Sequence, residues 1–287
     1  MNITAWLRAM RLQTLPVATS SLIVAVALIN QYVAANADAQ MNVTVTVLCF
    51  VFAILAQITS NFANEYYDYV RGGDKAGREG FRRGVAEGDI TPSAMKTAAI
   101  ITIGIACVVG LCLVPTGGLW LIPIGCVIAL GAFAYSAGPY PLSHHGLGEL
   151  AVVIFFGIVP ICMTFYLSTF TITAEVVKAS VAIGLLSANV LVVNNYRDYQ
   201  DDLDSDKHTL AVIIGRGIYK YLYILNGYVA ILLLTGAAPL WLNFTYLVLH
   251  TLAFALLLKK KGKALNKVLV VTSMLMLAYS LSLALCN

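Results

Sequence analysis

Residues 44–68 read TVTVLCFVFAILAQITSNFANEYYD, an apolar run that ends in closely spaced amide and carboxylate side chains. The apolar part is as long as the stretch of about 20 residues that a helix needs to cross a bilayer. Runs of this kind recur along the 287-residue chain, which is 60% hydrophobic and 11% charged. Because a soluble domain carries roughly 25% charged residues, the composition predicts a membrane protein without a separate soluble domain.

Nine such runs predict an all-α protein in which residues 1–287 form one integral membrane domain. The first run follows two arginines and precedes small residues, as a cleavable leader does, but its length suits a membrane span. The nine predicted transmembrane helices lie at residues 15–34, 44–66, 94–113, 118–136, 148–168, 177–199, 218–236, 239–258 and 265–285.

The basic residues predict how these helices are oriented. If the nine helices alternate in direction, only Lys178 of the 18 Lys and Arg residues lies apart, and the other 17 share one side of the membrane. The positive-inside rule assigns the side rich in Lys and Arg to the cytoplasm. The amino terminus is then cytoplasmic and the carboxyl terminus is outside. We expect the lipid bilayer, and no nucleic acid, as a partner.

Two of the apolar runs end in acidic clusters, at residues 61–74 and 194–206. Residues three and four positions apart share one face of a helix. Each cluster therefore has a stripe of amides and carboxylates, namely Asn61, Asn64, Glu65 and Asp68 in the first and Asn194, Asp198 and Asp202 in the second. The matching Asn-x-x-x-Asp pairs are offset by 130 residues, which indicates a weak internal duplication.

Carboxylates at a helix carboxyl end are unfavourable by themselves, because they oppose the helix dipole and repel one another. A hard divalent cation with oxygen ligands would offset both effects, and Mg²⁺ in proteins is usually shared between carboxylates and substrate phosphates. Both clusters are predicted on the cytoplasmic side, so one hypothesis is a diphosphate bridged by metal between them. The alternative is a pair of solvated acidic loops with lysine partners.

A glycine-rich loop follows the first cluster. Residues 71–90 contain six glycines, interleaved with the basic residues Lys75, Arg78, Arg82 and Arg83. Glycine lets a backbone approach a ligand closely, and Arg and Lys are donors that suit phosphate oxygens. The loop is therefore interpreted as a lid over an anionic group. The alternative is that its basic residues only set the membrane topology.

These motifs resemble those of UbiA-type membrane prenyltransferases. The stretch NFANEYYDYVRGGD at residues 61–74 looks like the first acidic motif of that family, and NNYRDYQDD at 194–202 looks like the second. More narrowly, the chain resembles the branch that prenylates 1,4-dihydroxy-2-naphthoate in menaquinone synthesis. The stretches that carry this second likeness are YSAGPYPL at 135–142, GLGE at 146–149, FFG at 155–157 and KHTLAV at 207–212.

The resemblance implies nine helices bundled around a central cavity that binds a polyprenyl diphosphate with Mg²⁺, the tail lying along an apolar wall. The implied reaction transfers the polyprenyl group to dihydroxynaphthoate, and diphosphate and CO₂ leave. The expected metal ligands are Asn64, Asp68, Asp74, Asp198 and Asp202. The expected substrate-binding residues are Lys207, Arg197, Arg83, Lys75 and Asn194, and the expected catalytic residues are Asp68, Asp198 and Tyr135.

Some roles stay open at this stage. Tyr135 either stabilises an allylic cation by cation–π contact or anchors its helix at the membrane interface. The sequence names no proton acceptor for the phenol; His144 and His145 lie in the adjacent loop and are interpreted as solvated. The sequence also departs from the family pattern at three positions, where it has Glu65 for Asp, Phe81 for Pro and Asp206 for Gly.

Two other functions compete with this interpretation. Membrane-embedded acids and an internal repeat also fit an ion-coupled transporter, although the acids gather at one membrane face. A different aromatic acceptor, such as 4-hydroxybenzoate or homogentisate, fits the same motifs. In either prenyltransferase reading, the protein is expected to be a multi-pass protein of the inner (cytoplasmic) membrane, with its active site facing the cytoplasm.

Overall fold

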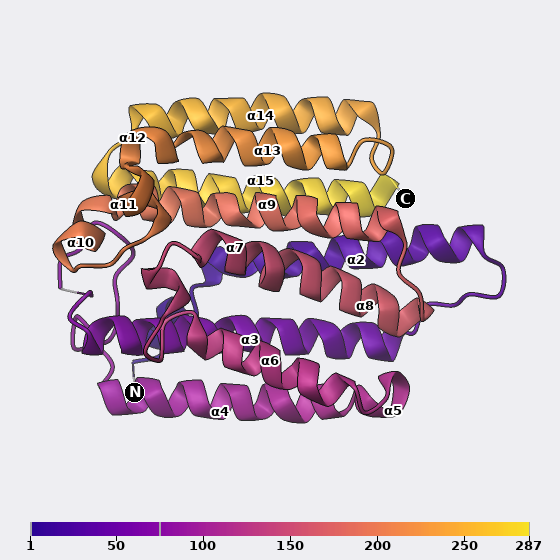
Figure 1. Cartoon of the computed structure of the whole chain (residues 1–287), viewed down its shortest axis with the longest axis horizontal. Coiled ribbons are helices and arrows are strands. Elements are labelled where there is room, and N and C mark those ends of the chain that lie inside the picture. Colours follow the sequence, from indigo (N-terminus) through magenta and orange to yellow (C-terminus); the bar gives the residue numbers. More distant parts are fainter. Residues whose placement is uncertain (1, 75, 287) are drawn as a thin grey trace.

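The computed structural model describes residues 2–74 and 76–286, which fold into helices that run along one common axis (Figure 1). The long helices are α2 (Leu15–Ala35), α3 (Val43–Val70), α4 (Pro92–Leu111), α6 (Leu121–Ala134), α9 (Ala174–Arg197), α13 (Tyr221–Leu233), α14 (Leu240–Lys259) and α15 (Leu265–Cys286), together with the segment of α7 (Gly148–Val153), η3 (Ile154–Ile158) and α8 (Val159–Thr169). The short helices are α1 (Ile3–Ala9), η1 (Leu12–Thr14), α5 (Val114–Gly117), η2 (Leu142–His144), α10 (Tyr199–Asp204), α11 (Leu210–Ile214), α12 (Arg216–Tyr219) and η4 (Gly262–Ala264).

The all-α membrane architecture is confirmed. Within residues 2–74 and 76–286, seven helical stretches are long and apolar enough to cross a membrane. The two remaining predicted spans, 118–136 and 218–236, correspond to the shorter helices α6, of 14 residues, and α13, of 13 residues. The count of nine spans therefore stays a prediction, as does their orientation.

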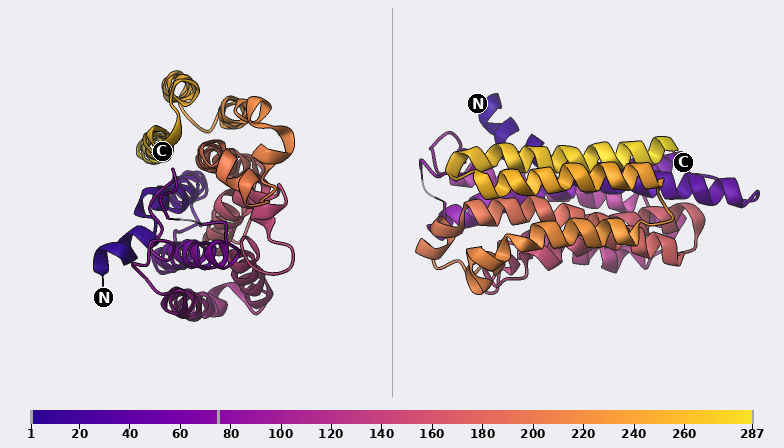
Figure 2. Two further views of the ribbon diagram at one scale, coloured as in Figure 1. Left: turned by 90° about the vertical axis from the view of Figure 1, so that its left-hand side faces the viewer. Right: turned by 90° about the horizontal axis from the view of Figure 1, so that it is seen from above.

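Helix α9 lies at the centre of the bundle and packs against α2, α7, η3, α13 and α15. Small and β-branched side chains allow this close packing, and 15 of its residues are buried. Helices α3, α4 and α6 lie on one side of it, and α13, α14 and α15 on the other (Figures 1 and 2). The carboxyl ends of α3 and α9 lie at the same end of the bundle, at the left in Figure 1, so the fold brings the two acidic motifs together.

The segment from α7 to α8 contains a π-helical turn at Ile154–Ile158, and Pro160 gives its cause. Proline has no N–H to donate to the carbonyl of Phe156, four residues earlier. The Ser21 hydroxyl of α2 donates to that carbonyl instead, which satisfies a backbone group that would be costly to leave unpaired inside a membrane. The extra residue in the turn redirects the side chains that follow α7, and Phe155 and Phe156 both line a cavity.

Candidate active site

The two acidic motifs meet through two basic side chains. Arg78, from the glycine-rich loop, donates to Asp74 of the first motif, and its Nη2 lies 2.5 Å from Asp198 Oδ2 of the second. Lys207 Nζ lies 3.6 Å from Asp68 Oδ2 and 3.7 Å from Asp202 Oδ1. Each cation therefore bridges one carboxylate from each motif, although the motifs are 130 residues apart in sequence.

The predicted duplication is visible in the hydrogen bonds. Asn64 Nδ2 donates to Asp68 Oδ2 over 3.1 Å, and Asn194 Nδ2 donates to Asp198 Oδ2 over 3.4 Å. The rest of the first stripe diverges, because Glu65 accepts the backbone N–H of Val85 over 3.0 Å. Glu65 thus holds the loop of residues 71–90 against α3 and does not face the other carboxylates.

The remaining cations differ in how completely they are bonded. Arg197 is fully engaged: its Nε donates to Asp198 over 2.7 Å, and its other two nitrogens bond Asn194, Asn266 and Asp198. Arg83 is held loosely. Its Nε lies 3.2 Å from Asp74 Oδ2, but the contact is not aligned as a hydrogen bond, and both atoms are buried without a hydrogen-bond partner.

Burial shapes the charge of the site. It raises the pKa of Asp202 to about 6, helped by the nearby carboxylates of Asp198 and Asp68 and opposed by Lys207. Burial also raises the pKa of Asp74 above its ordinary value. Lys207 behaves in the opposite way: burial lowers its pKa, but Asp68 and Asp202 outweigh this and the net shift is upward. Burial therefore disfavours the ionised forms of Asp74 and Asp202, and an added cation would favour them.

The donor atoms fit Mg²⁺ chemically. Asp and Asn oxygens from two helix ends face one another, and hard divalent cations prefer oxygen ligands. Among the residues that the structure describes, no three His, Cys, Asp or Glu side chains are close enough to form a metal cage. This matches the usual mode of Mg²⁺, which takes one or two carboxylates and completes its shell with water and substrate phosphate.

A polar cavity of about 140 Å³ lies between the motifs. Its wall includes the cations Arg11, Arg78, Arg83 and Lys207 and the carboxylates Asp68, Glu149 and Asp198. Cationic side chains therefore outnumber carboxylates on the wall, which favours an anionic occupant.

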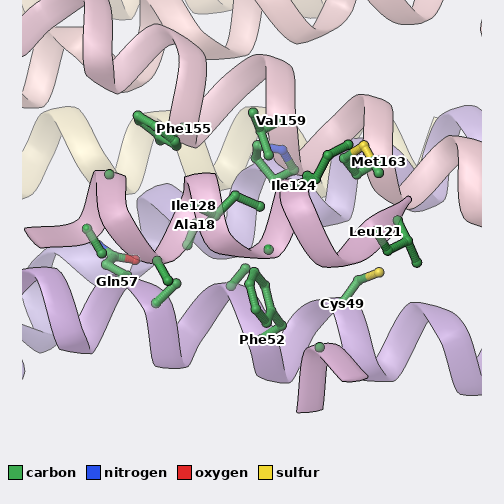
Figure 3. A pocket seen from close by; sticks show the side chains of 18 of the residues that line it. Ala18, Cys49, Phe52, Gln57, Leu121, Ile124, Ile128, Phe155, Val159 and Met163 are labelled. Atoms are coloured by element: carbon green, nitrogen blue, oxygen red, sulfur yellow. The ribbon is translucent and has the colours of Figure 1, made fainter. Parts of the chain in front are cut away.

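A second cavity, of about 300 Å³, is apolar and continues from the first. The two share five wall residues, namely Gln57, Ser60, Tyr135, Val152 and Phe156. Figure 3 shows the apolar cavity running from Gln57 past Phe52 and Phe155 toward Cys49, Leu121 and Met163. One chamber for an anion thus opens directly into one for a long apolar group.

The sequence profile of the UbiA prenyltransferase family matches residues 21–268. The chain belongs to this family. It is 36% identical to 1,4-dihydroxy-2-naphthoate octaprenyltransferase of Escherichia coli (strain K12), over 74% of this chain and 68% of that protein. The enzyme with the same name from Haemophilus influenzae is 33% identical, over 73% of this chain and 69% of the relative.

Solved structures of the UbiA family have the same fold. A UbiA homolog from Aeropyrum pernix K1 superposes with a TM-score of 0.66 at 12% identity, covering 93% of this chain and 97% of that one. A UbiA homolog from Archaeoglobus fulgidus, bound to GPP and Mg²⁺, gives a TM-score of 0.60 at 15% identity, over 98% and 99% of the two chains. At these identities the likeness shows the fold alone.

The two cavities and the residues around them include most of the residues that the sequence singled out. Tyr135 lines both cavities, at their junction. Lys75 lies outside the described residues. Asp204 is exposed and accepts from Gln200 over 2.8 Å, and Asp206 has a backbone φ of 54° with its side chain in solvent. The helix that carries the second motif does not continue to Asp206. Helix α9 ends at Arg197, and the chain bends at Asp198 before α10 begins.

Several residues that contact the first motif were given no role in the site from the sequence. His144 was interpreted as solvated, but its Nε2 lies 3.5 Å from Asp68 Oδ1. Arg11 was assigned only a topological role, yet it donates to Asn64. Ser136 is fully buried and accepts from Asn64 Nδ2 over 2.9 Å. Nothing in the local sequence marks Arg11, because only the tertiary fold brings it to α3, whereas the motif that contains Glu149 was quoted without a role for that carboxylate.

Proposed function

We propose that the protein transfers a polyprenyl group from an allylic diphosphate to 1,4-dihydroxy-2-naphthoate, with loss of CO₂ and diphosphate, to give demethylmenaquinol, the hydroquinone form of demethylmenaquinone. One observation carries the proposal: a polar cavity with a cationic wall opens into an apolar cavity, and the two share five wall residues. A polyprenyl diphosphate has this shape and polarity. The acceptor is supported by the names of the relatives, which are dihydroxynaphthoate octaprenyltransferases.

The polar cavity binds the diphosphate in this proposal. Arg78 and Lys207 each lie between two carboxylates, so they turn from carboxylate to phosphate oxygens as the substrate enters. Arg83 is poorly bonded and is free to do the same. We propose the same role for Lys75, because it belongs to the same basic loop. Arg197 is already saturated with hydrogen bonds and acts by holding Asp198 and Asn194 in place.

Magnesium would be held by Asn64, Asp68, Asp74, Asp198 and Asp202, the oxygen donors of the two motifs. When bound, Mg²⁺ neutralises charge on the leaving diphosphate. The carboxylates that Arg78 and Lys207 release would be the ligands of this metal, so they would keep a cationic partner. Each of the four aspartates is buried, which keeps water from competing for these contacts.

Tyr135 stands where the reacting carbon would lie, because it lines both the head and the tail cavity. Its ring face can stabilise an allylic cation, and the surrounding apolar wall excludes the water that would quench it. The tail then extends along the apolar cavity, which reaches the exposed residues Cys107 and Ile122 on α4 and α6. A tail longer than the cavity would continue between these helices into lipid.

The test of this function is an assay with purified protein in detergent. Polyprenyl diphosphate and Mg²⁺ are supplied with 1,4-dihydroxy-2-naphthoate, 4-hydroxybenzoate or homogentisate, and prenylated product, CO₂ and diphosphate are measured. We expect product from the naphthoate alone, with one CO₂ and one diphosphate for each prenyl group, and no turnover with chelator. Product from another acceptor only would refute the naphthoate assignment. An enzyme that releases no diphosphate would return attention to the transporter alternative.

We also propose that the site faces the cytoplasm from the inner membrane. The motif end of the bundle carries the basic loops, and α15 ends at the opposite end of the bundle (Figure 1). A reporter active only outside the cytoplasm, fused after Asn287, is expected to be active. Activity of a cytoplasmic reporter at that position would overturn both the orientation and the count of nine spans.

A further inference from the structure

Glu149 is a buried carboxylate of the polar cavity that neither the metal nor the diphosphate uses. It lies in the first turn of α7 and is 9% exposed. Asn195 Nδ2 donates to its Oε1 over 2.9 Å, and the Tyr219 hydroxyl donates to the same oxygen. Its other oxygen, Oε2, is buried without a hydrogen-bond partner. Because the residue lines the polar cavity, Oε2 is available to a donor on a bound molecule.

Glu149 also differs from the aspartates in charge environment. The four aspartates contact Arg78, Arg83, Arg197 or Lys207, whereas Glu149 forms no ion pair with any Lys, Arg or His in residues 2–74 and 76–286. A carboxylate tied to a cation is a poor proton acceptor. Glu149 instead accepts from the phenol of Tyr219, and the Tyr135 hydroxyl lies 3.4 Å from the place of a Cβ on Gly148, the residue before Glu149. Glu149 therefore lies beside the proposed reacting carbon.

We propose that Glu149 is the proton acceptor of the reaction and binds the acceptor through the ring hydroxyl next to its carboxyl group. This inference rests on the proposed function. Asn195 and Tyr219 fix Oε1, which leaves Oε2 as the unpartnered oxygen of this cavity-lining residue. The class of substrate that the site selects is then an arene with a hydroxyl group beside the carbon to be prenylated.

The step balances as follows. The hydroxyl proton moves to Glu149 Oε2, and the oxygen electron pair is delocalised onto the ring carbon that bears the carboxylate. That carbon forms the bond to the prenyl carbon, whose bond to diphosphate breaks with both electrons leaving on diphosphate. The bond to the carboxylate then breaks, CO₂ leaves, and its electron pair restores the aromatic ring. The ring oxygen takes the proton back from Glu149, which returns to its starting state.

The principal experiment compares Glu149→Gln with the wild-type enzyme. Gln keeps the shape and can still accept from Asn195 and Tyr219, but it takes up no proton. We expect kcat to fall by about 10²–10⁴-fold, the usual contribution of a general base, while the KM for prenyl diphosphate changes less than about twofold. The kcat of the variant should rise with pH as the acceptor ionises by itself. Glu175→Gln, the same change at an exposed first-turn glutamate of α9, should leave kcat unchanged.

Acceptor analogues give an independent readout. An acceptor whose hydroxyl next to the carboxyl group is methylated should not react with the wild-type enzyme, whereas methylation of the other hydroxyl should be tolerated. A ring substituent that acidifies the reactive hydroxyl should restore turnover in Glu149→Gln. If Glu149→Gln does not fold, Glu149→Asp carries the test. Asp keeps an ionising group, so this variant should have a lower kcat that still falls at acid pH.

Three results would overturn the inference. The first is a Glu149→Gln enzyme with the kcat and pH profile of wild type, and the second is a Glu149→Gln enzyme whose affinity for prenyl diphosphate falls as much as its kcat. The third is a Glu149→Asp enzyme whose kcat does not fall at acid pH. Each of these leaves the proposed function standing. If instead the wild-type enzyme prenylates only another hydroxyarene, the naphthoate assignment fails, and the same comparison of Glu149→Gln with wild type is decided with that arene.

Discussion

The two acidic motifs have the same internal hydrogen bond but are held in different ways. Asp68, of the first motif, has partners at a distance: His144 at 3.5 Å and Lys207 at 3.6 Å, both partly exposed. Asp198, of the second, is held more closely, by the buried Arg197 at 2.7 Å and by Arg78, whose side chain is 11% exposed, at 2.5 Å. Asp68 is therefore more open to a ligand than Asp198, which must exchange a closely bonded partner before it binds one.

This difference also separates catalysis from stability. Burial raises the pKa of Asp198, but Arg197 and Arg78 outweigh it, so the net pKa lies below the ordinary value. Such a carboxylate is ionised throughout the working range and contributes stability that is present at neutral pH and is lost only as acid protonates it. Both motifs are proposed to bind metal, but Asp198 also neutralises two arginines, Arg197 and Arg78, whereas Asp68 forms no ion pair with an arginine in residues 2–74 and 76–286.

The largest effects are expected from Asp68→Asn and Asp198→Asn. Each removes a charged metal ligand, which is worth several kcal/mol and corresponds to a loss of turnover on the order of 10³-fold or more. Asp198→Asn should in addition destabilise the fold by about 3–5 kcal/mol, because the buried guanidinium of Arg197 loses its charged partner, whereas Arg78 keeps Asp74. Asp68→Asn should cost less than about 1 kcal/mol, since its partners are loose and partly exposed.

Prenyl transfer across a Mg²⁺ titration and unfolding in detergent would measure the two effects. Equal stability of both variants would show that the motifs are held alike, and the comparison would fail. Full turnover in either variant at ordinary Mg²⁺ would refute the metal assignment.

The next effect concerns the cation that joins the two motifs. Arg78→Ala should lower kcat/KM for prenyl diphosphate by about 10²-fold, the scale of one lost charge-stabilising donor. Arg82→Ala is the matched control from the same loop, because Arg82 is exposed and pairs with Asp89 instead. If the loop only sets topology, the two variants will lose the same activity. Steady-state kinetics at fixed Mg²⁺ distinguish these results.

A smaller effect tests the geometry of the second motif. Asp202→Asn should lower turnover by about tenfold, because it removes a buried carboxylate that contacts Lys207. Asp204→Asn should stay within about twofold of wild type, because Asp204 points into solvent. Equal losses in both variants, measured in the same prenyl transfer assay, would show that the stripe of carboxylates is assigned to the wrong face.

Sequence periodicity predicted the helices well, because a helix in a bilayer must satisfy its own backbone and so follows directly from apolar length. The stripes were also predictable where the helix is regular, as at Asn64 and Asp68. The pattern gave less where the backbone bends: α9 ends at Arg197, the chain bends at Asp198, and Asp206 adopts a left-handed backbone. The partners of the carboxylates, such as Arg11 and His144, depend on tertiary contacts that no local pattern encodes.

The smallest expected effect sharpens the same comparison at the turn that follows each motif. After α3, the left-handed position is taken by Gly72, with φ of 77°, whereas after α10 it is taken by Asp206, with φ of 54°. A left-handed backbone costs an L residue roughly 1–2 kcal/mol, and Asp pays less of this than most. Asp206→Gly should therefore stabilise the fold by up to about 1 kcal/mol, while Asp206→Ala should destabilise it by a similar amount. Asp206→Asn keeps the backbone preference and removes only the charge, so it isolates any effect of the anion on prenyl diphosphate binding. If unfolding in detergent shows Asp206→Gly to be no more stable than Asp206→Asn, the turn is unstrained, and the two motifs end in equivalent ways after all.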